Sequence, residues 1–317
     1  MQRYNSEREG QKIKSKKVSD FRGCFRIFFS ACVLFFTVFL FSCKSPVQFE
    51  QVDPLNLVSG DSVIIVYVPV SANADFVEYA VTELFALSQK NASTVVPRMK
   101  NLVLASEKQG TIQVAVEGTF PKSGIKMAFS EKNGWQTKNS SDTVFPFSVY
   151  SSNELSMEVA VPDSKTILAS DDVSRMLLRY ESQQSAFVND GTEKNPENLL
   201  NAKICDFLTD NGGEQIRFYA QKPGDLFGRL VGKTINLGLT SLAGILEKSK
   251  AGDKFALTLN LELSNSAVSK AAVKMLKIAL FPLPAKILQK SSMEIQISDI
   301  SLTYAQLVGF LGIIQEI

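Results

Sequence analysis

The sequence predicts an α+β protein of two similar antiparallel-sheet units with helices packed on one face, after an N-terminal signal or anchor segment. Three observations support this fold class. Runs rich in β-branched residues alternate with amphipathic helical patterns. The short strands are joined by turns, which favours antiparallel pairing. Cues in the second half repeat those of the first half in the same order, which is typical of a duplicated unit.

The first unit is expected over residues 61–181. Ser62–Val70 is β-branched and aromatic, as in a buried strand. Asp75 precedes a helix with one wide apolar face. Thr111–Phe120 alternates as a strand, residues 121–124 have turn chemistry, and Ile125–Phe129 would complete a hairpin. Further strands at 145–150, 155–161 and 167–169 lead to a helix that Asp171 and Asp172 cap.

The second unit is expected over residues 197–317, after a polar linker at 182–196. A helix would begin at Pro196 and end at the glycines of 211–213. Strands at 215–221, 255–263 and 292–299 surround a helix at Ser266–Phe281. The apolar segment Tyr304–Ile314 is too short to span a membrane and is expected to be a buried last helix.

The repeat rests on three correspondences. Ser156–Asp163 and Ser292–Asp299 agree at four of eight positions. Upstream of these octamers, Glu107-Lys108 corresponds to Glu247-Lys248, and Asp75-Phe76 corresponds to Asp225-Leu226. The predicted sheets of the two units can be separate or joined edge to edge.

Composition excludes several enzyme classes. The 317 residues include no histidine, so there is no Ser-His-Asp triad, no Cys-His dyad and no imidazole metal ligand. Only four cysteines are present, which disfavours zinc and iron–sulfur sites.

The N-terminal segment has the pattern of an export signal. Residues 1–26 contain eight basic and three acidic side chains, and the fifteen residues of Ile27–Phe41 carry no charge. A basic region followed by a short apolar run describes a signal peptide, whereas a membrane-spanning helix needs about 20 apolar residues. The basic flank stays cytoplasmic, so the C-terminal part is exported.

Leu40-Phe41-Ser42-Cys43 resembles the lipobox of bacterial lipoproteins, in which a branched apolar residue and small residues precede an invariant cysteine. Phe41 departs from that pattern. The resemblance implies a signal peptide at 1–42, cleavage before Cys43, a fatty acid such as palmitate on Cys43, and a tether at 43–60. It places the protein in the bacterial envelope, lipid-anchored on the exported side, at the periplasmic or outer-membrane face. The alternative is an uncleaved anchor helix.

Cleavage changes the charge balance. Removing the eight basic and three acidic side chains of the leader leaves 275 residues with a net charge of −3. This acidic balance disfavours nucleic acid as a partner. Of the four cysteines only Cys43 and Cys205 remain, and Cys205 is expected to be a buried, inert thiol.

Candidate catalytic motifs fail on spacing or context. The segment Gly228–Thr234 has three residues between its glycines where a P-loop needs four. Ser123 and Lys126 satisfy S-x-x-K, but the predicted position is a hairpin turn. Asp206, Asp210 and Glu214 form at most a loose cation cluster. We therefore predict no catalytic residue, no cofactor and no metal site.

The function predicted is that of a membrane-anchored envelope lipoprotein, either a binding or a scaffolding module. Enzymatic activity is left open. Two other functions remain as alternatives to a binding or scaffolding module. A carboxylate-based hydrolase needs a deep cleft with two facing acids. A lipid-binding protein needs a large apolar cavity. Lys270, Lys274 and Lys277 form one stripe of the 266–281 helix, which either docks on the sheet with a solvated lysine edge or lies on anionic lipid.

Overall fold

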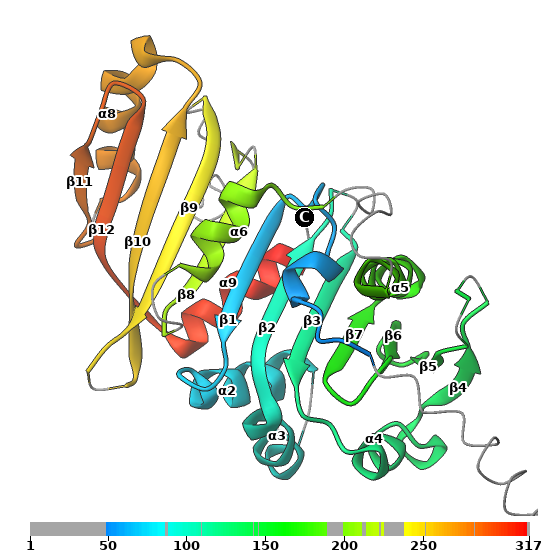
Figure 1. Ribbon diagram of the computed structural model, residues 1–317. Coiled ribbons are helices and arrows are strands. Elements are labelled where there is room, and N and C mark those ends of the chain that lie inside the picture. Colours follow the sequence, from blue (N-terminus) through cyan, green and yellow to red (C-terminus); the bar gives the residue numbers. More distant parts are fainter. Residues whose placement is uncertain are drawn as a thin grey trace, which may run out of the picture. The chain divides into compact units, whose positions relative to one another are not determined.

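A single antiparallel sheet organises the protein. The computed structural model (Figure 1) describes residues 49–315 apart from 86–87, 109, 142, 145, 189–198, 211–213, 222, 225–237, 251 and 282. In this part of the chain, twelve strands form one sheet in the order β11-β12-β10-β9-β8-β1-β2-β3-β7-β6-β5-β4. The mixture of helices and antiparallel sheet confirms the predicted fold class.

The first half of the sheet contains seven strands. They are β1 (Ile64–Pro69), β2 (Met99–Ser106), β3 (Ile112–Gly118), β4 (Gln136–Asn139), β5 (Ser148–Ser152), β6 (Met157–Ala160) and β7 (Thr166–Ser170). The helices of this half are η1 (Pro54–Leu57), α2 (Ala74–Phe85), α3 (Gln89–Val95), η2 (Val96–Arg98), α4 (Lys122–Ala128), η3 (Glu131–Asn133) and α5 (Ser174–Val188).

The second half contains five strands. They are β8 (Ile216–Gln221), β9 (Leu239–Lys248), β10 (Lys254–Leu263), β11 (Lys286–Gln289) and β12 (Glu294–Thr303). The described helices here are α6 (Ala202–Thr209), η4 (Ser266–Val268), α8 (Ser269–Ala279) and α9 (Tyr304–Gln315). None of the helices within the described residues has the length and hydropathy to span a bilayer.

The two halves join through β1 and β8. These strands pair antiparallel from Ile64 opposite Ala220 to Tyr67 opposite Arg217. The joined sheet realises the edge-to-edge arrangement, one of the two that the sequence allowed. Residues Glu50–Ile317 therefore form one compact unit.

Helices cover both faces of the joined sheet, because successive strand residues point to opposite sides. On one side, Ile64, Val66 and Val68 of β1 lie in a core that also contains buried residues of α2, α8 and α9. We call this side the α2 face. On the other side, η1 lies near β2 and β3, α5 contacts η1, and α6 contacts β8 and β1. Figure 1 shows α6 and α9 on opposite sides of the sheet, which corrects the expectation of helices on one face only.

Residues 50–58 are part of the folded unit and not of a free tether. Leu55, Leu57 and Val58 are at most 1% exposed and lie on the side of the sheet opposite the α2 face. Each such apolar side chain contributes about 1.5–3 kcal/mol on burial. We call residues 50–58 the strap. The tether predicted at 43–60 therefore overlaps the fold from residue 50 onward.

The strap is also held by hydrogen bonds. The Gln184 side chain accepts from the Glu50 backbone N–H at 3.0 Å and donates to the Glu50 carbonyl at 2.6 Å. Gln51 donates to the Glu117 carboxylate, and Asp53 caps η1 by accepting from the Leu55 N–H at 2.9 Å. Arg179 donates to the Leu57 carbonyl at 3.4 Å.

Several predicted elements differ from the observed ones. Residues 122–128 form α4, so the predicted hairpin of 111–129 is wrong, and β3 pairs instead with β2 and β7. Residues 182–188 continue α5, so the predicted linker begins too early. Helix α6 begins at Ala202 after the Asn201 cap and not at Pro196, which lies outside the described residues.

The two matched octamers occupy different positions in the sheet. The first lies at β6, which pairs with β5 and β7. The second lies at β12, which pairs with β10 and β11. The octamer correspondence is therefore wrong as an alignment of strands.

Candidate functional site

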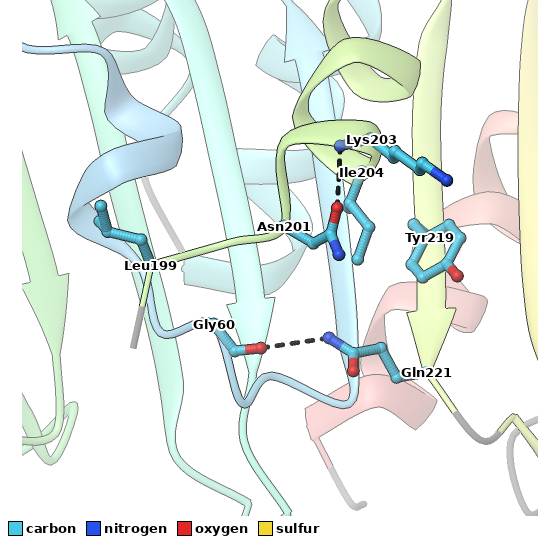
Figure 2. A pocket seen from close by; sticks show the side chains of 7 residues that line it. All are labelled: Gly60, Leu199, Asn201, Lys203, Ile204, Tyr219 and Gln221. Carbon is cyan, nitrogen blue, oxygen red and sulfur yellow. Dashed lines mark hydrogen bonds between the residues drawn. The ribbon is translucent and has the colours of Figure 1, made fainter. Parts of the chain in front are cut away.

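A groove lies where the two halves of the sheet meet, beside the start of α6 (Figure 2). Its volume is about 500 Å³. The residues that line it come from the loop before β1, from the segment that leads into α6, from α6 itself and from β8. They are Gly60, Leu199, Asn201, Lys203, Ile204, Tyr219 and Gln221.

The polar groups of this groove serve mainly to hold the backbone. Gln221 donates to the Gly60 carbonyl at 3.1 Å. Asn201 accepts from the Lys203 backbone N–H at 2.9 Å, and this bond caps α6. The lining includes no carboxylate and mixes polar with apolar side chains, so it provides neither the facing acids of a glycosidase nor an enclosed apolar cavity.

A second polar cluster lies under the strap. Glu117, 7% exposed, accepts from Lys100 at 2.8 Å and from Asn101 at 2.6 Å, in addition to Gln51. Burial, with the nearby charges of Asp53 and Glu117, raises the pKa of Tyr67 to about 12. The Glu117 carboxylate thus accepts from Gln51 of the strap and from Lys100 and Asn101 of β2, so the cluster ties the strap to the sheet.

Two of the three acids that the sequence grouped as a loose cluster, Asp206, Asp210 and Glu214, make contacts outside that group. Asp210 Oδ2 lies 3.6 Å from Arg217 Nη1, and the Glu214 carbonyl accepts from Asn73. Among the residues that the structure describes, no group of three or more acidic, cysteine or histidine side chains could hold a metal ion. Asp206, Asp210 and Glu214 are therefore not brought together into such a group.

The other sequence candidates have structural surroundings. Asp172 accepts from the Ser174 N–H at 2.9 Å, which lowers its pKa and caps α5 as predicted. Cys205 is half-buried, and burial raises the pKa of its thiol. Ser123 and Lys126 lie exposed on α4 and not in a hairpin turn. Cys43 and the Gly228–Thr234 segment lie outside the described residues.

Helix α8 presents an apolar surface away from the sheet. Its buried residues include Ala272 and Leu276, and Leu280 at the C-cap is buried as well. On another side Met275 is 39%, Ile278 is 70% and the following Phe281 is 81% exposed. We call Met275, Ile278 and Phe281 the α8 stripe. The helix docks through Ala272, Leu276 and Leu280, which leaves Met275 and Ile278 exposed.

Basic side chains border the α8 stripe. Lys270, Lys274 and Lys277 are all exposed and follow one side of the helix. Lys286 on β11 is exposed as well, as is the apolar Leu288 at 49%. An exposed apolar strip beside lysines is the arrangement found in helices that lie in the interface of an anionic bilayer.

Comparison with protein families matches residues 49–308 to a family described as "Outer membrane-associated lipoprotein TP0453". The chain belongs to this family. The membership supports the resemblance to lipoproteins and confirms the predicted localisation in the cell envelope. Membrane association follows for this chain from the same finding.

Solved structures of TP0453 share the fold. Crystal form I has a TM-score of 0.64 and 18% identity, over 83% of this chain and 98% of that chain. Crystal form III has a TM-score of 0.61 and 18% identity, over 84% and 99% of the two chains. A search of curated proteins found no match.

Proposed function

We propose that this protein is a lipid-anchored outer-membrane-associated module whose folded unit makes a second contact with an anionic bilayer through the α8 stripe. The observation that carries the proposal is the exposure of Ile278 and Phe281 beside three lysines on a helix already docked by its opposite side. The bilayer is thus the binding partner that we propose for this module.

The lipid anchor is proposed at Cys43. Its support is the fifteen-residue apolar run that ends near this cysteine, together with the lipoprotein family of the chain. Cells fed a radiolabelled fatty acid should label the wild-type protein, and Cys43→Ala should abolish the label. Label that persists in Cys43→Ala would rule out this anchor.

A contact with the bilayer would explain why the apolar side chains of the α8 stripe are exposed on a helix that is already docked. Large apolar side chains gathered on a surface mark an interaction site. Each lysine near an anionic membrane surface adds about 1 kcal/mol to binding, and salt screens that contribution. Apolar burial and lysine attraction therefore both favour a bilayer that contains anionic lipid.

The contact can be tested by tryptophan quenching, because Trp135 is the protein's one tryptophan. In a Trp135→Phe background, Ile278→Trp places the reporter in the α8 stripe. We expect brominated anionic vesicles to quench this reporter in the full-length lipidated protein, and added salt to weaken the quenching. Substituting Lys270, Lys274 and Lys277 by Gln should weaken it further.

The matched control is Ala256→Trp in the same background. Ala256 is exposed on β10 in the same half, and it alternates with Phe255 and Leu257 of the α2-face core. We expect little quenching at residue 256. Equal quenching at residues 256 and 278, or none at 278, would contradict a contact through α8.

We also propose that the two halves derive from one repeated unit. Outward from the centre, the strands run β1, β2, β3, β7, β6 in one half and β8, β9, β10, β12, β11 in the other. In each half a helix, α4 or α8, follows the third strand. This order equates β6 with β11 and β7 with β12. A superposition of the two halves that fails to overlay these pairs would argue against the repeat.

A further inference from the structure

The strap begins close to the proposed lipid. Glu50 is seven residues after Cys43, and it is the first residue whose backbone Gln184 holds. A fully extended chain spans at most about 3.3–3.6 Å per residue, so seven residues reach about 24 Å. The folded unit therefore starts within that distance of the bilayer.

The strap is fixed along its whole length. At its start, Gln184 is 7% exposed and makes two hydrogen bonds to the backbone of Glu50. At its end, Leu57 and Val58 are fully buried, and the next residue, Ser59, donates its N–H to Gln113 at 2.8 Å. Without these contacts the free tether would lengthen from seven residues to about sixteen on the sequence numbering.

We infer that the strap keeps the tether short so that the α8 stripe meets the membrane as an intramolecular contact at high effective concentration. This inference rests on the proposed function, both on the lipid at Cys43 and on the α8 contact. An anchored chain searches only the volume that its tether allows, so a weak surface contact is occupied when the tether is short.

Tether length then sets the occupancy of the α8 contact. Effective concentration falls roughly as the −3/2 power of tether length once the tether is long enough to span the two sites. A 20-residue Gly/Ser insertion between Ser45 and Pro46 lengthens the tether from 7 to 27 residues. The equilibrium constant for the anchored contact should fall by up to about eightfold.

The experiment uses the full-length lipidated protein with Trp135→Phe and Ile278→Trp in brominated anionic vesicles. Salt is set where quenching is half-maximal, so that a change in occupancy is visible. The control carries the same insertion between Glu154 and Leu155, in the exposed β5–β6 turn, and should quench like the parent. Quenching that ignores the Ser45–Pro46 insertion would overturn the inference but leave the α8 contact intact. Absence of quenching at every tether length would instead remove the proposed function itself.

Hydrogen exchange tests the strap directly. We expect slow exchange at the Glu50 amide, and about fivefold faster exchange there in Gln184→Ala, which corresponds to one net hydrogen bond. Gln183→Ala on the same helix is the control and should leave this rate unchanged, because Gln184 supplies both bonds to Glu50. Rapid exchange throughout residues 50–58 of the wild type would show that the strap is open, which would also overturn the inference.

Discussion

At the scale of single residues, close packing explains why a glycine stands inside β9. Gly244 pairs with Phe218 of β8, and a Cβ at Gly244 would lie 2.0 Å from the Phe218 ring. The ring is 2% exposed and packs against Phe310 of α9. The missing side chain of Gly244 thus makes the space that the ring fills.

We therefore predict that Gly244→Ala destabilises the protein. Overpacking of a dense core costs typically about 1–3 kcal/mol, since rings and backbone must shift. Urea unfolding followed by circular dichroism would measure the loss. Gly309→Ala in α9 is the control, because a Cβ there meets nothing within 4 Å, and alanine should stabilise that helix by up to about 1 kcal/mol. Equal effects of the two substitutions would contradict the packing argument.

A second residue-scale feature links three elements through Asp75. Its carboxylate accepts from Lys248 at 2.6 Å and from the Tyr304 hydroxyl at 2.7 Å. Burial alone would raise the pKa of Asp75, but these hydrogen bonds outweigh burial and lower the pKa below its ordinary value of 3.8. The carboxylate therefore stabilises the fold when it is ionised.

The lowered pKa predicts a pH dependence of stability. A carboxyl group with a depressed pKa in the folded state contributes its stability above the unfolded pKa and loses it as pH falls through the folded pKa. We expect the free energy of unfolding to drop below about pH 5, and Asp75→Asn to reduce that drop by at most about 1 kcal/mol, since the side chain is half exposed. Chemical unfolding from pH 6 to pH 3 would measure both curves. Parallel curves would show that Asp75 does not contribute.

At the scale of elements, the strap is the segment whose role differs most from its sequence pattern. Two prolines and scattered polar residues in 44–60 favour a tether. In the structure, the apolar residues between those polar ones are buried. Gln51 bonds to Glu117 of the sheet, and Asp53 caps η1 within the strap itself.

The strap gives a stability prediction. Leu57 has no exposed surface, so Leu57→Ala should cost about 2–5 kcal/mol through lost burial and the cavity left behind. Leu288→Ala, at a side chain that is 49% exposed, should change stability by less than about 0.5 kcal/mol. Thermal or urea unfolding of the two variants would test this contrast, and a small effect at Leu57 would mean that the strap does not belong to the cooperative fold.

At the scale of the whole molecule, the β1–β8 pair and a shared core couple the halves. The α2-face core contains residues from β1 and α2 as well as from β10, β12 and α9. The β1–β8 pair also joins the two halves by backbone pairing from Ile64 opposite Ala220 to Tyr67 opposite Arg217. Nothing in the described part therefore separates the halves into independent folding units.

We predict a single cooperative unfolding transition for the whole of residues 50–317. In calorimetry, the measured enthalpy should equal the van't Hoff enthalpy. The melting temperature should be unchanged by EDTA, because removing a metal that binds only the native state would lower it. It should also be unchanged by dithiothreitol, because Cys205 is a free thiol. Two resolved transitions would contradict the coupling of the halves, and a drop with EDTA would reveal a metal.

The fold class, most strands of the second half and the leader pattern could be predicted from the amino-acid sequence. Those features depend on local periodicity, since alternation marks strands and a charge-free run marks the leader. The sequence did not predict β2, β4, β9 or β11, and it placed the octamers at equivalent positions although β6 and β12 occupy different places in the sheet. Pairing partners are set by contacts far apart in the chain, which an octamer match cannot report.

The side of α8 that docks and the residue at which the tether ends are set by contacts in the folded protein. Helix α8 has apolar residues on two sides, and its periodicity fits either side equally well. In the folded protein Leu276 and Leu280 pack into the core, which leaves Ile278 exposed. The sequence pattern assigns Glu50 and Gln51 to the tether, because the residues that bind them are far away in the chain. Gln184 lies 134 positions from Glu50, and Glu117 lies 66 positions from Gln51.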